Sequence, residues 1–223
     1  MTRTHGPRRM MVRFGLAALA VGFTALLPKT AASIGPALDF TTIGTVGNNW
    51  SPTLNGFSMG WEFNVLNPIE IARLGYFNYG PSGSGITQAH QVGIFNSSGT
   101  LLVSTTVNPG DPVQGNWAWK SLVTPYHLSA GTGYVIAALT GKDDLYTWSV
   151  PSIVQDPSIS YVRNRYQRTP TGTLINPTFT TSFYPGYHFF GPNMDIVPEP
   201  AFLQLPMLMG LGGLAYWRRR KQA

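Results

Sequence analysis

The stretch QVGIFNSSGTLLVSTTV, residues 91–107, is the clearest structural signal in the sequence. Two runs of alternating character flank the turn residues NSSGT, which begin at Asn96. Alternation with a period of two residues is typical of a strand that buries one face. Gly99 is available for the positive φ of a tight turn, which glycine adopts without steric cost. The stretch therefore predicts an antiparallel β-hairpin.

Segments of the same kind recur between turn residues along the middle of the chain. The expected strands cover residues 59–65, 69–79, 89–96, 100–107, 117–123, 134–139, 158–168 and 186–197. The 25 glycines and 18 prolines supply the turns, and no helical period separates the strands. The pattern predicts an all-β fold, an antiparallel β-sandwich that is jelly-roll-like.

The net charge of +6 comes from the two ends of the chain. Nine of the 15 basic residues lie in the first 33 residues or among the last six. Six basic and eight acidic residues remain between Ser33 and Val197, so the middle carries about −2. This distribution argues against a nucleic-acid-binding protein. The absence of cysteine excludes disulfides and thiolate metal sites.

The first 33 residues have the pattern of a signal peptide for secretion. The basic RRMMVR precedes an apolar run from Phe14 to Leu27 and the small residues TAAS, 30–33. At 1.5 Å per residue that run covers about 21 Å of a ~30 Å membrane core, which is short for a permanent anchor. We expect a signal peptide over 1–33 with cleavage after Ala32 or Ser33; an uncleaved anchor is the alternative.

The last 27 residues contain VPEP at 197–200, an apolar run from Ala201 to Trp217 and then RRRK. The basic residues would keep this end on the cytoplasmic side of the membrane. This order, with glycines inside the apolar run, resembles the PEP-CTERM sorting signal of Gram-negative bacteria. The resemblance implies a transient transmembrane helix and processing by an exosortase. The residues that carry it are Val197, Pro198, Glu199, Pro200, Arg218, Arg219 and Arg220.

The domain expected over residues 34–196 carries a second resemblance. The hairpin at 91–107, the aromatic strand from Trp117 and the corner LSAGTGY at 128–134 are similar to a family of small secreted bacterial β-sandwich domains of unassigned function. The resemblance spans roughly 60–139 and rests on structural glycines and aromatic residues. It implies no catalytic residue and no cofactor.

Candidate catalytic and metal-binding residues are few. Glu62 and Glu70 have the residue type of a glycosidase pair, but nothing in the sequence fixes their separation. Asp143 and Asp144 would suit either a calcium ion or a solvated turn. The widely spaced histidines lack a metal-ligand pattern, and no serine occupies a nucleophile elbow. We expect no enzyme activity and no metal.

Aromatic residues and arginines supply the candidate binding surface. Trp117 and Trp119 point to one side of a strand, as a buried edge that continues to Val123 or as a sugar-stacking platform. A second set suits acidic polysaccharide, with Tyr161, Arg163 and Arg165 expected on one strand face. The candidates are Trp148, Tyr161, Arg163, Arg165 and Arg168.

Together these patterns predict an exported, non-catalytic protein of the cell surface or extracellular matrix. After transient anchoring in the inner membrane, it would act as a structural or adhesive component of exopolysaccharide or biofilm. Its expected partners are an exosortase and extracellular polysaccharide, with no nucleic acid. A carbohydrate-binding module is the alternative function, and a secreted glycoside hydrolase is a less favoured one.

Overall fold

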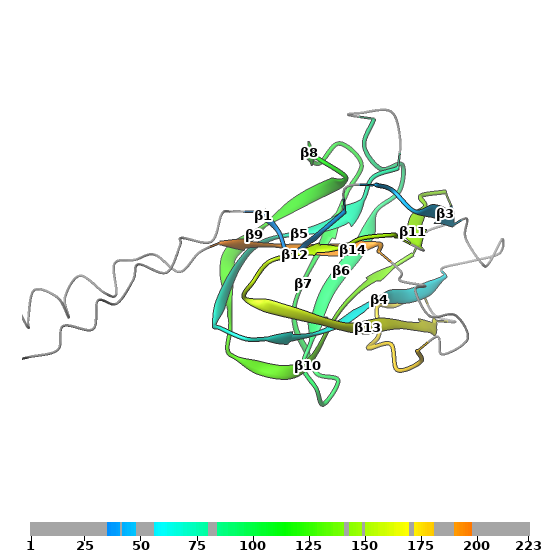
Figure 1. The fold of residues 1–223 in the computed structure, drawn as a ribbon. Coiled ribbons are helices and arrows are strands. Elements are labelled where there is room, and N and C mark those ends of the chain that lie inside the picture. Colours follow the sequence, from blue (N-terminus) through cyan, green and yellow to red (C-terminus); the bar gives the residue numbers. More distant parts are fainter. Residues whose placement is uncertain are drawn as a thin grey trace, which may run out of the picture. The chain divides into compact units, whose positions relative to one another are not determined.

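A computed structural model describes residues 35–40, 42–47, 56–79, 84–140, 143–148, 150–169, 172–180 and 190–197. These residues form strands, turns and irregular segments, and none of them is helical (Figure 1). All strand pairs are antiparallel, which confirms the prediction of an all-β antiparallel fold. The predicted signal peptide and C-terminal helix lie outside the described residues. Within the described part of the chain, no helix has the length and hydrophobicity needed to cross a membrane.

Two five-stranded sheets make up most of the described structure (Figure 1). The first, here called the β4 sheet, has the order β13 (Ile159–Arg168), β4 (Phe57–Val65), β10 (Gly131–Leu139), β6 (His90–Phe95) and β7 (Leu101–Val107). The second, the β5 sheet, has the order β1 (Gly35–Pro36), β14 (Pro192–Val197), β5 (Ile69–Phe77), β9 (Trp117–Leu128) and β8 (Val113–Gln114). Two short pairs complete the set: β11 (Tyr146–Trp148) with β3 (Thr45–Gly47), and β12 (Val154–Gln155) with β2 (Leu38–Asp39).

The hairpin predicted from residues 91–107 is formed by β6 and β7. Asn96 N–H donates to the Thr100 carbonyl at 3.0 Å, and Gly99 N–H donates to the Asn96 carbonyl at 2.9 Å. Gly99 has a φ of 83°, the left-handed conformation expected at this position. The Asn96 side chain also accepts the Ser98 N–H at 3.1 Å. The local sequence thus determines the turn and sets the register of the two strands.

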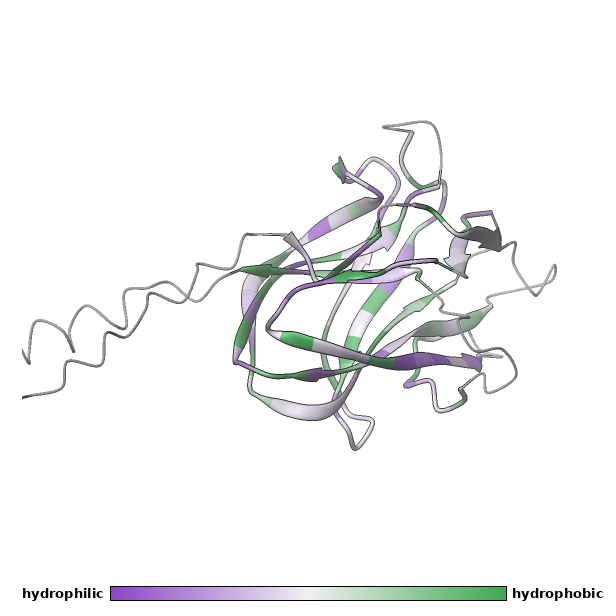
Figure 2. Cartoon of the chain, in the orientation of Figure 1, coloured by the Kyte–Doolittle hydropathy of each residue, from purple (hydrophilic) through white to green (hydrophobic). Residues whose placement is uncertain are grey.

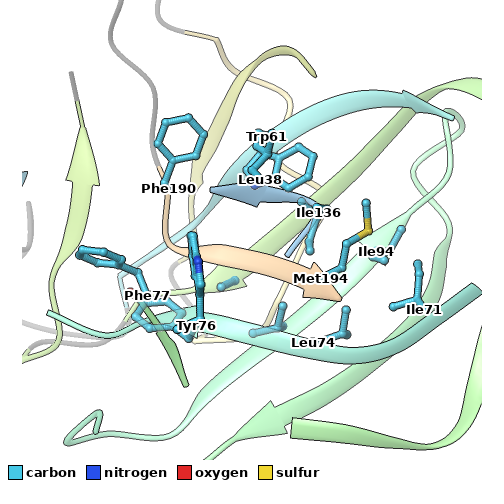
Figure 3. Packing of buried hydrophobic residues seen from close by; sticks show 14 of the residues in the cluster. Leu38, Trp61, Ile71, Leu74, Tyr76, Phe77, Ile94, Ile136, Phe190 and Met194 are labelled. Carbon is cyan, nitrogen blue, oxygen red and sulfur yellow. The ribbon is translucent and has the colours of Figure 1, made fainter. Parts of the chain in front are cut away.

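Both sheets contribute to one hydrophobic cluster (Figure 3). Trp61, Ile94 and Ile136 come from the β4 sheet, and Leu74 and Met194 from the β5 sheet; all five are fully buried. The Trp61 indole N–H donates to the Pro192 carbonyl at 3.0 Å, so a hydrogen bond also joins the two sheets. Burial of each large apolar side chain contributes about 2 kcal/mol to the free energy of folding. The hydrophobic core is therefore formed by side chains of both sheets.

Strand β9 differs from its prediction because it continues five residues beyond 123 and contains a wide bulge. Its register with β5 jumps from Ser121 opposite Arg73 to Tyr126 opposite Ile71. The bulge leaves Val123 fully exposed, with a relative accessibility of 105%. The expectation that the buried face of Trp117 and Trp119 continues to Val123 is therefore wrong.

Candidate functional site

Glu62 is a buried carboxylate that two arginines of the neighbouring strand share. Arg163 Nε donates to Glu62 Oε2 at 2.9 Å, and Arg163 Nη2 reaches Oε1 at 3.4 Å. Arg165 Nε donates to the same Oε2 at 2.9 Å, and its Nη2 also contacts that oxygen. The Arg165 Nη1 donates to the Thr178 carbonyl at 2.8 Å. Glu62, Arg163 and Arg165 are here called the Glu62 cluster. Its two guanidinium groups and one carboxylate give it one net positive charge.

The exposure of the two arginines differs. The Arg163 side chain is 52% exposed, whereas that of Arg165 is 22% exposed. The C-terminal half of β13 is hydrophilic, as its purple colour in Figure 2 shows. The Glu62 cluster thus presents Arg163 to solvent while Arg165 serves mainly as an internal partner of Glu62.

A bulge in β13 decides which residues face the Glu62 cluster. Tyr161 pairs with Phe63, but Arg163 pairs with Glu62, so Val162 is an extra residue in the ladder. An extra residue reverses the side of the sheet to which the following side chains point. Tyr161 therefore faces the core with Phe63, and Arg163 faces outward with Glu62. The predicted common face of Tyr161, Arg163 and Arg165 is wrong for Tyr161.

The remaining candidates do not join the Glu62 cluster either. Tyr161 packs against Trp61 and Phe190, with ring centroids 6.4 Å and 6.1 Å away, and burial raises the pKa of its hydroxyl. Arg168 is exposed at the end of β13, opposite Phe57 and three positions beyond Arg165. Because sides alternate along a strand, it lies on the face opposite Arg165. Trp148 ends β11, and its side chain lies outside the described residues.

The sorting motif is described at its first residue alone. Val197 is the last residue of β14 and pairs with Glu70 of β5. On the other side of β14, Ile196 pairs with Gly35 of β1. The remaining motif residues lie outside the described structure; they are Pro198, Glu199, Pro200, Arg218, Arg219 and Arg220.

A second polar centre, which no sequence pattern predicted, is built around His90. Its ring is fully buried and stacks on Tyr76, with centroids 3.6 Å apart and an interplanar angle of 1°. His90 Nδ1 lies 3.0 Å from the Leu139 carbonyl, and Nε2 lies 2.8 Å from Asp144 Oδ2. Both partner oxygens are hydrogen-bond acceptors, so a ring nitrogen of His90 that carries a proton donates to the oxygen beside it.

Asp144 also closes the turn before β6. It accepts hydrogen bonds from the Thr87 N–H, the Thr87 hydroxyl and the Gln88 N–H, at 2.7–3.0 Å. Burial acts to raise the pKa of this carboxyl, but the hydrogen bonds from His90, Thr87 and Gln88 outweigh it and lower the pKa to about 2. Both oxygens already accept from protein donors, which disfavours the calcium alternative at Asp143–Asp144. Asp143 is exposed in this turn, as the solvated-turn alternative expects, whereas Asp144, with a side chain 8% exposed, is a structural acceptor.

Two further ion pairs lie in the domain, one between residues 122 positions apart and one between residues nine positions apart. Arg73 Nε donates to Asp195 Oδ2 at 2.6 Å, and its guanidinium lies 5.0 Å from the centre of a Trp119 ring. Lys120 Nζ donates to Asp111 Oδ1 at 2.9 Å. Trp119 is itself 2% exposed beneath Arg73, and Trp117 is 1% exposed. These tryptophans belong to the core, as the favoured interpretation of the sequence had it, and offer no open stacking platform.

The glycosidase pair considered from the sequence is separated by the fold. Glu62 lies on β4 and Glu70 on β5, in different sheets. Glu70 pairs with His127 and Val197, while Glu62 is held by Arg163 and Arg165. Among the described residues, no group of three or more histidine, aspartate or glutamate side chains is placed to hold a metal ion.

Comparison with known proteins places this domain in a family. Searches of curated proteins and of solved structures gave no significant match. A family model described as "Domain of unknown function (DUF4082)" matches residues 45–182. The matched segment includes β3 to β13, and with them the hairpin, the Glu62 cluster and the His90–Asp144 pair. Since the match covers more than half of the 223 residues, the chain belongs to the DUF4082 family.

Proposed function

We propose that this protein is an exported, non-catalytic structural or adhesive component of the extracellular polysaccharide or biofilm. Its described part would be a jelly-roll-like β-sandwich. The core shared by the two five-stranded sheets supports that architecture. Export rests on the basic and apolar pattern of residues 1–33, and sorting rests on the PEP-CTERM resemblance of residues 197–223.

The pairing of β1 with β14 is the observation that carries the proposal. Gly35 lies opposite Ile196, so the chain enters and leaves the β5 sheet at adjacent positions. The expected signal-peptide cut lies just before Gly35, and the VPEP motif starts at the last residue of β14. Among the described residues, every buried core residue lies between Ala37 and Ile196, so cuts before Gly35 and after Val197 would leave that core intact, as processing at both ends requires.

The acidic side chains support a role as a scaffold rather than an enzyme. Glu62, Asp111, Asp144 and Asp195 each accept hydrogen bonds from a basic side chain of the domain. A catalytic acid or base must reach its substrate with an accessible, uncommitted oxygen. Asp195 Oδ1 has no hydrogen-bond partner among the described residues, but it is buried. Their engagement in internal pairs fits a protein whose polar groups stabilise the fold.

Replacement of Glu199 by alanine tests the sorting proposal in the producing bacterium. The change removes the carboxylate of the VPEP motif and no core residue, so the domain should fold normally. We expect the variant to remain in the membrane fraction with its RRRK terminus, while the parent is released. Gln204→Ala, five residues further on, is the matched control and should be released. Equal release of the Glu199 variant would contradict recognition of this motif.

A carbohydrate-binding function is the second candidate, and the Glu62 cluster favours it. Arg163 is half exposed and Glu62 balances only one of the two guanidinium charges. A uronic acid carboxylate would pair with the exposed side of Arg163. Exposed contacts of this kind contribute about 1 kcal/mol or less and weaken with salt. The expected ligand is therefore an acidic polysaccharide with many repeating contacts rather than a short sugar.

A further inference from the structure

Strand β7 forms one edge of the β4 sheet and has no strand on its outer side among the described residues. It spans seven residues, Leu101–Val107, most of them partly or fully exposed. Apart from β6, one described group bonds to its backbone: the Asn108 side chain donates to the Thr106 carbonyl at 3.1 Å. The outward backbone N–H and C=O groups of β7 are thus available to another strand.

The other three edges of the two large sheets are protected. β1 contains two residues, one of them Pro36. β8 covers only Trp117 and Ala118 of β9, and the rest of that edge of β9 carries Lys120, Pro125 and the wide bulge. β13 is longer than β1, but it carries the bulge at Val162 and the three arginines of the candidate set. The Phe179 carbonyl also accepts from the Tyr166 N–H at 2.9 Å, and the Phe179 N–H donates to the Tyr166 carbonyl at 3.2 Å, which covers part of the β13 edge.

β7 has none of these protective features over its last five residues. The sequence LLVSTTV contains no charged residue, no proline and no glycine. Its register with β6 is regular from Val103 to Val107, and the irregularity lies at the Leu101 end. Proteins commonly block such edges with charge, proline or a bulge, because an open edge recruits a further strand. The contrast with the other edges marks β7 as a surface for strand addition.

We propose that β7 binds β7 of a second copy of this chain, as an antiparallel pair related by a two-fold axis. The regular segment Val103–Val107 is centred on Thr105, and overlap of that segment is complete when Thr105 lies opposite itself. The β4 sheet then continues from one copy into the next as ten strands. This assembly goes beyond the proposed function and does not depend on export or sorting.

The side chains of β7 favour its own copy as the partner. With Thr105 at the centre, Val103 lies opposite Val107 of the second copy, and Ser104 opposite its Thr106. Val–Val, Ser–Thr and Thr–Thr pairs are favourable cross-strand combinations, worth about 0.2–1 kcal/mol each. The absence of charge means that pairing two identical edges brings no like charges together. A basic or acidic partner strand would find no charged side chain on β7 with which to form an ion pair.

The position of β7 leaves the ends of the domain accessible in such a dimer. β7 packs near β5 and β9, whereas β1 and β14 lie at the edge of the β5 sheet away from β9. The chain enters and leaves the domain through β1 and β14. Self-pairing at β7 therefore leaves both ends unobstructed.

Because the chain has no cysteine, a single introduced thiol reports the pairing directly. The experiment uses the full-length chain in detergent, with Thr105→Cys as the test and Thr124→Cys, exposed in the β9 bulge, as the matched control. Opposed cysteines on antiparallel strands lie within disulfide distance. We expect Thr105→Cys to form disulfide-linked dimers at least about tenfold faster than Thr124→Cys at equal concentration.

A mixture of two other variants keeps the test independent of the folding of Thr105→Cys. Ser104→Cys and Thr106→Cys should form mixed dimers faster than either forms dimers with itself, because residue 104 faces residue 106 in the proposed register. Equal rates for Thr105→Cys and Thr124→Cys, or no preference for the 104–106 combination, would overturn the proposal. Sedimentation equilibrium of the unsubstituted chain gives a second test. A chain that is monomeric at about 100 μM, a concentration well above the dissociation constant expected of a specific dimer, would also overturn the proposal.

Discussion

Asn193 of β14 binds both the backbone N–H and the carbonyl of Leu38. Its Oδ1 accepts from Leu38 N–H at 3.3 Å, and its Nδ2 donates to the Leu38 carbonyl at 2.6 Å. Asn193 and Leu38 are both fully buried. One side chain thus joins the first strands of the domain to the last, beside the pairing of Gly35 with Ile196.

Asn193→Ala should therefore loosen the connection between the two ends of the domain. The change leaves a buried N–H and a buried carbonyl of Leu38 without these partners, which costs about 2–3 kcal/mol of unfolding free energy. Urea unfolding of the full-length chain measures the loss. Asn108→Ala, which removes an exposed amide, should change stability by less than about 1 kcal/mol. Equal effects of the two substitutions would contradict the structural role of Asn193.

Acid should destabilise the domain in part through Asp144. Its folded pKa of about 2 lies below the ordinary aspartate value near 3.9, so on acidification the unfolded chain takes up a proton at this carboxyl first. The stabilising contribution is complete above about pH 4, falls as the pH drops and is lost below about pH 2. Unfolding free energies from pH 6 to pH 2 should fall less steeply for Asp144→Asn than for the parent. Parallel pH curves would contradict this role.

The Glu62 cluster should depend on its carboxylate more than on either arginine. Glu62→Gln leaves two guanidinium groups facing each other, and we expect a loss of about 2 kcal/mol, less than for a fully buried pair because Arg163 is half exposed. Glu70→Gln, on the other sheet, is the control and should cost less. Arg165→Ala should destabilise more than Arg163→Ala because Arg165 is the more buried. Thermal unfolding of the four variants gives the order, and the reverse order for the arginines would refute the description of the cluster.

Substitution of Arg163 should weaken binding to acidic polysaccharide more than substitution of Arg168. Arg163→Ala removes the exposed cation of the Glu62 cluster, so co-sedimentation with alginate should weaken at low salt. Arg168→Ala removes an equal charge from the opposite face of β13 and should have a smaller effect. If the two variants lose binding equally, a non-specific charge effect replaces the carbohydrate-binding candidate. If neither loses binding, Arg163 is a structural residue alone.

The sequence predicted the eight longer strands because alternation and turn residues are local signals, but it did not predict the strands of two or three residues, which are β1, β2, β3, β8, β11 and β12. The hairpin at Gly99 and the boundaries of β4, β6 and β13 agree with the expected ranges within two residues. The bulges could not be predicted, because an extra residue such as Val162 leaves the local pattern nearly unchanged but reverses every later side chain. This is why Tyr161 and Arg163 face opposite sides.

The polar centres could not be predicted for a different reason. Glu62 and Arg163 are 101 positions apart, and His90 and Asp144 are 54 apart. The pairing of β4 with β13 brings Glu62 to Arg163. The segment after β10 carries Asp144 to His90 at the start of β6. Residue type alone left a glycosidase pair and a calcium turn open as disfavoured alternatives, whereas the fold commits Glu62 and Asp144 to hydrogen bonds within the domain.

The intact mass of the protein recovered outside the producing cells tests the central proposal most directly. We predict a chain that begins at Ser33 or Ile34 and ends shortly after Val197, within or just beyond the VPEP motif. Such a chain keeps β1 and β14 and lacks both address segments. An extracellular protein that retains the RRRK terminus, or one found in the membrane alone, would contradict processing at the C-terminal signal.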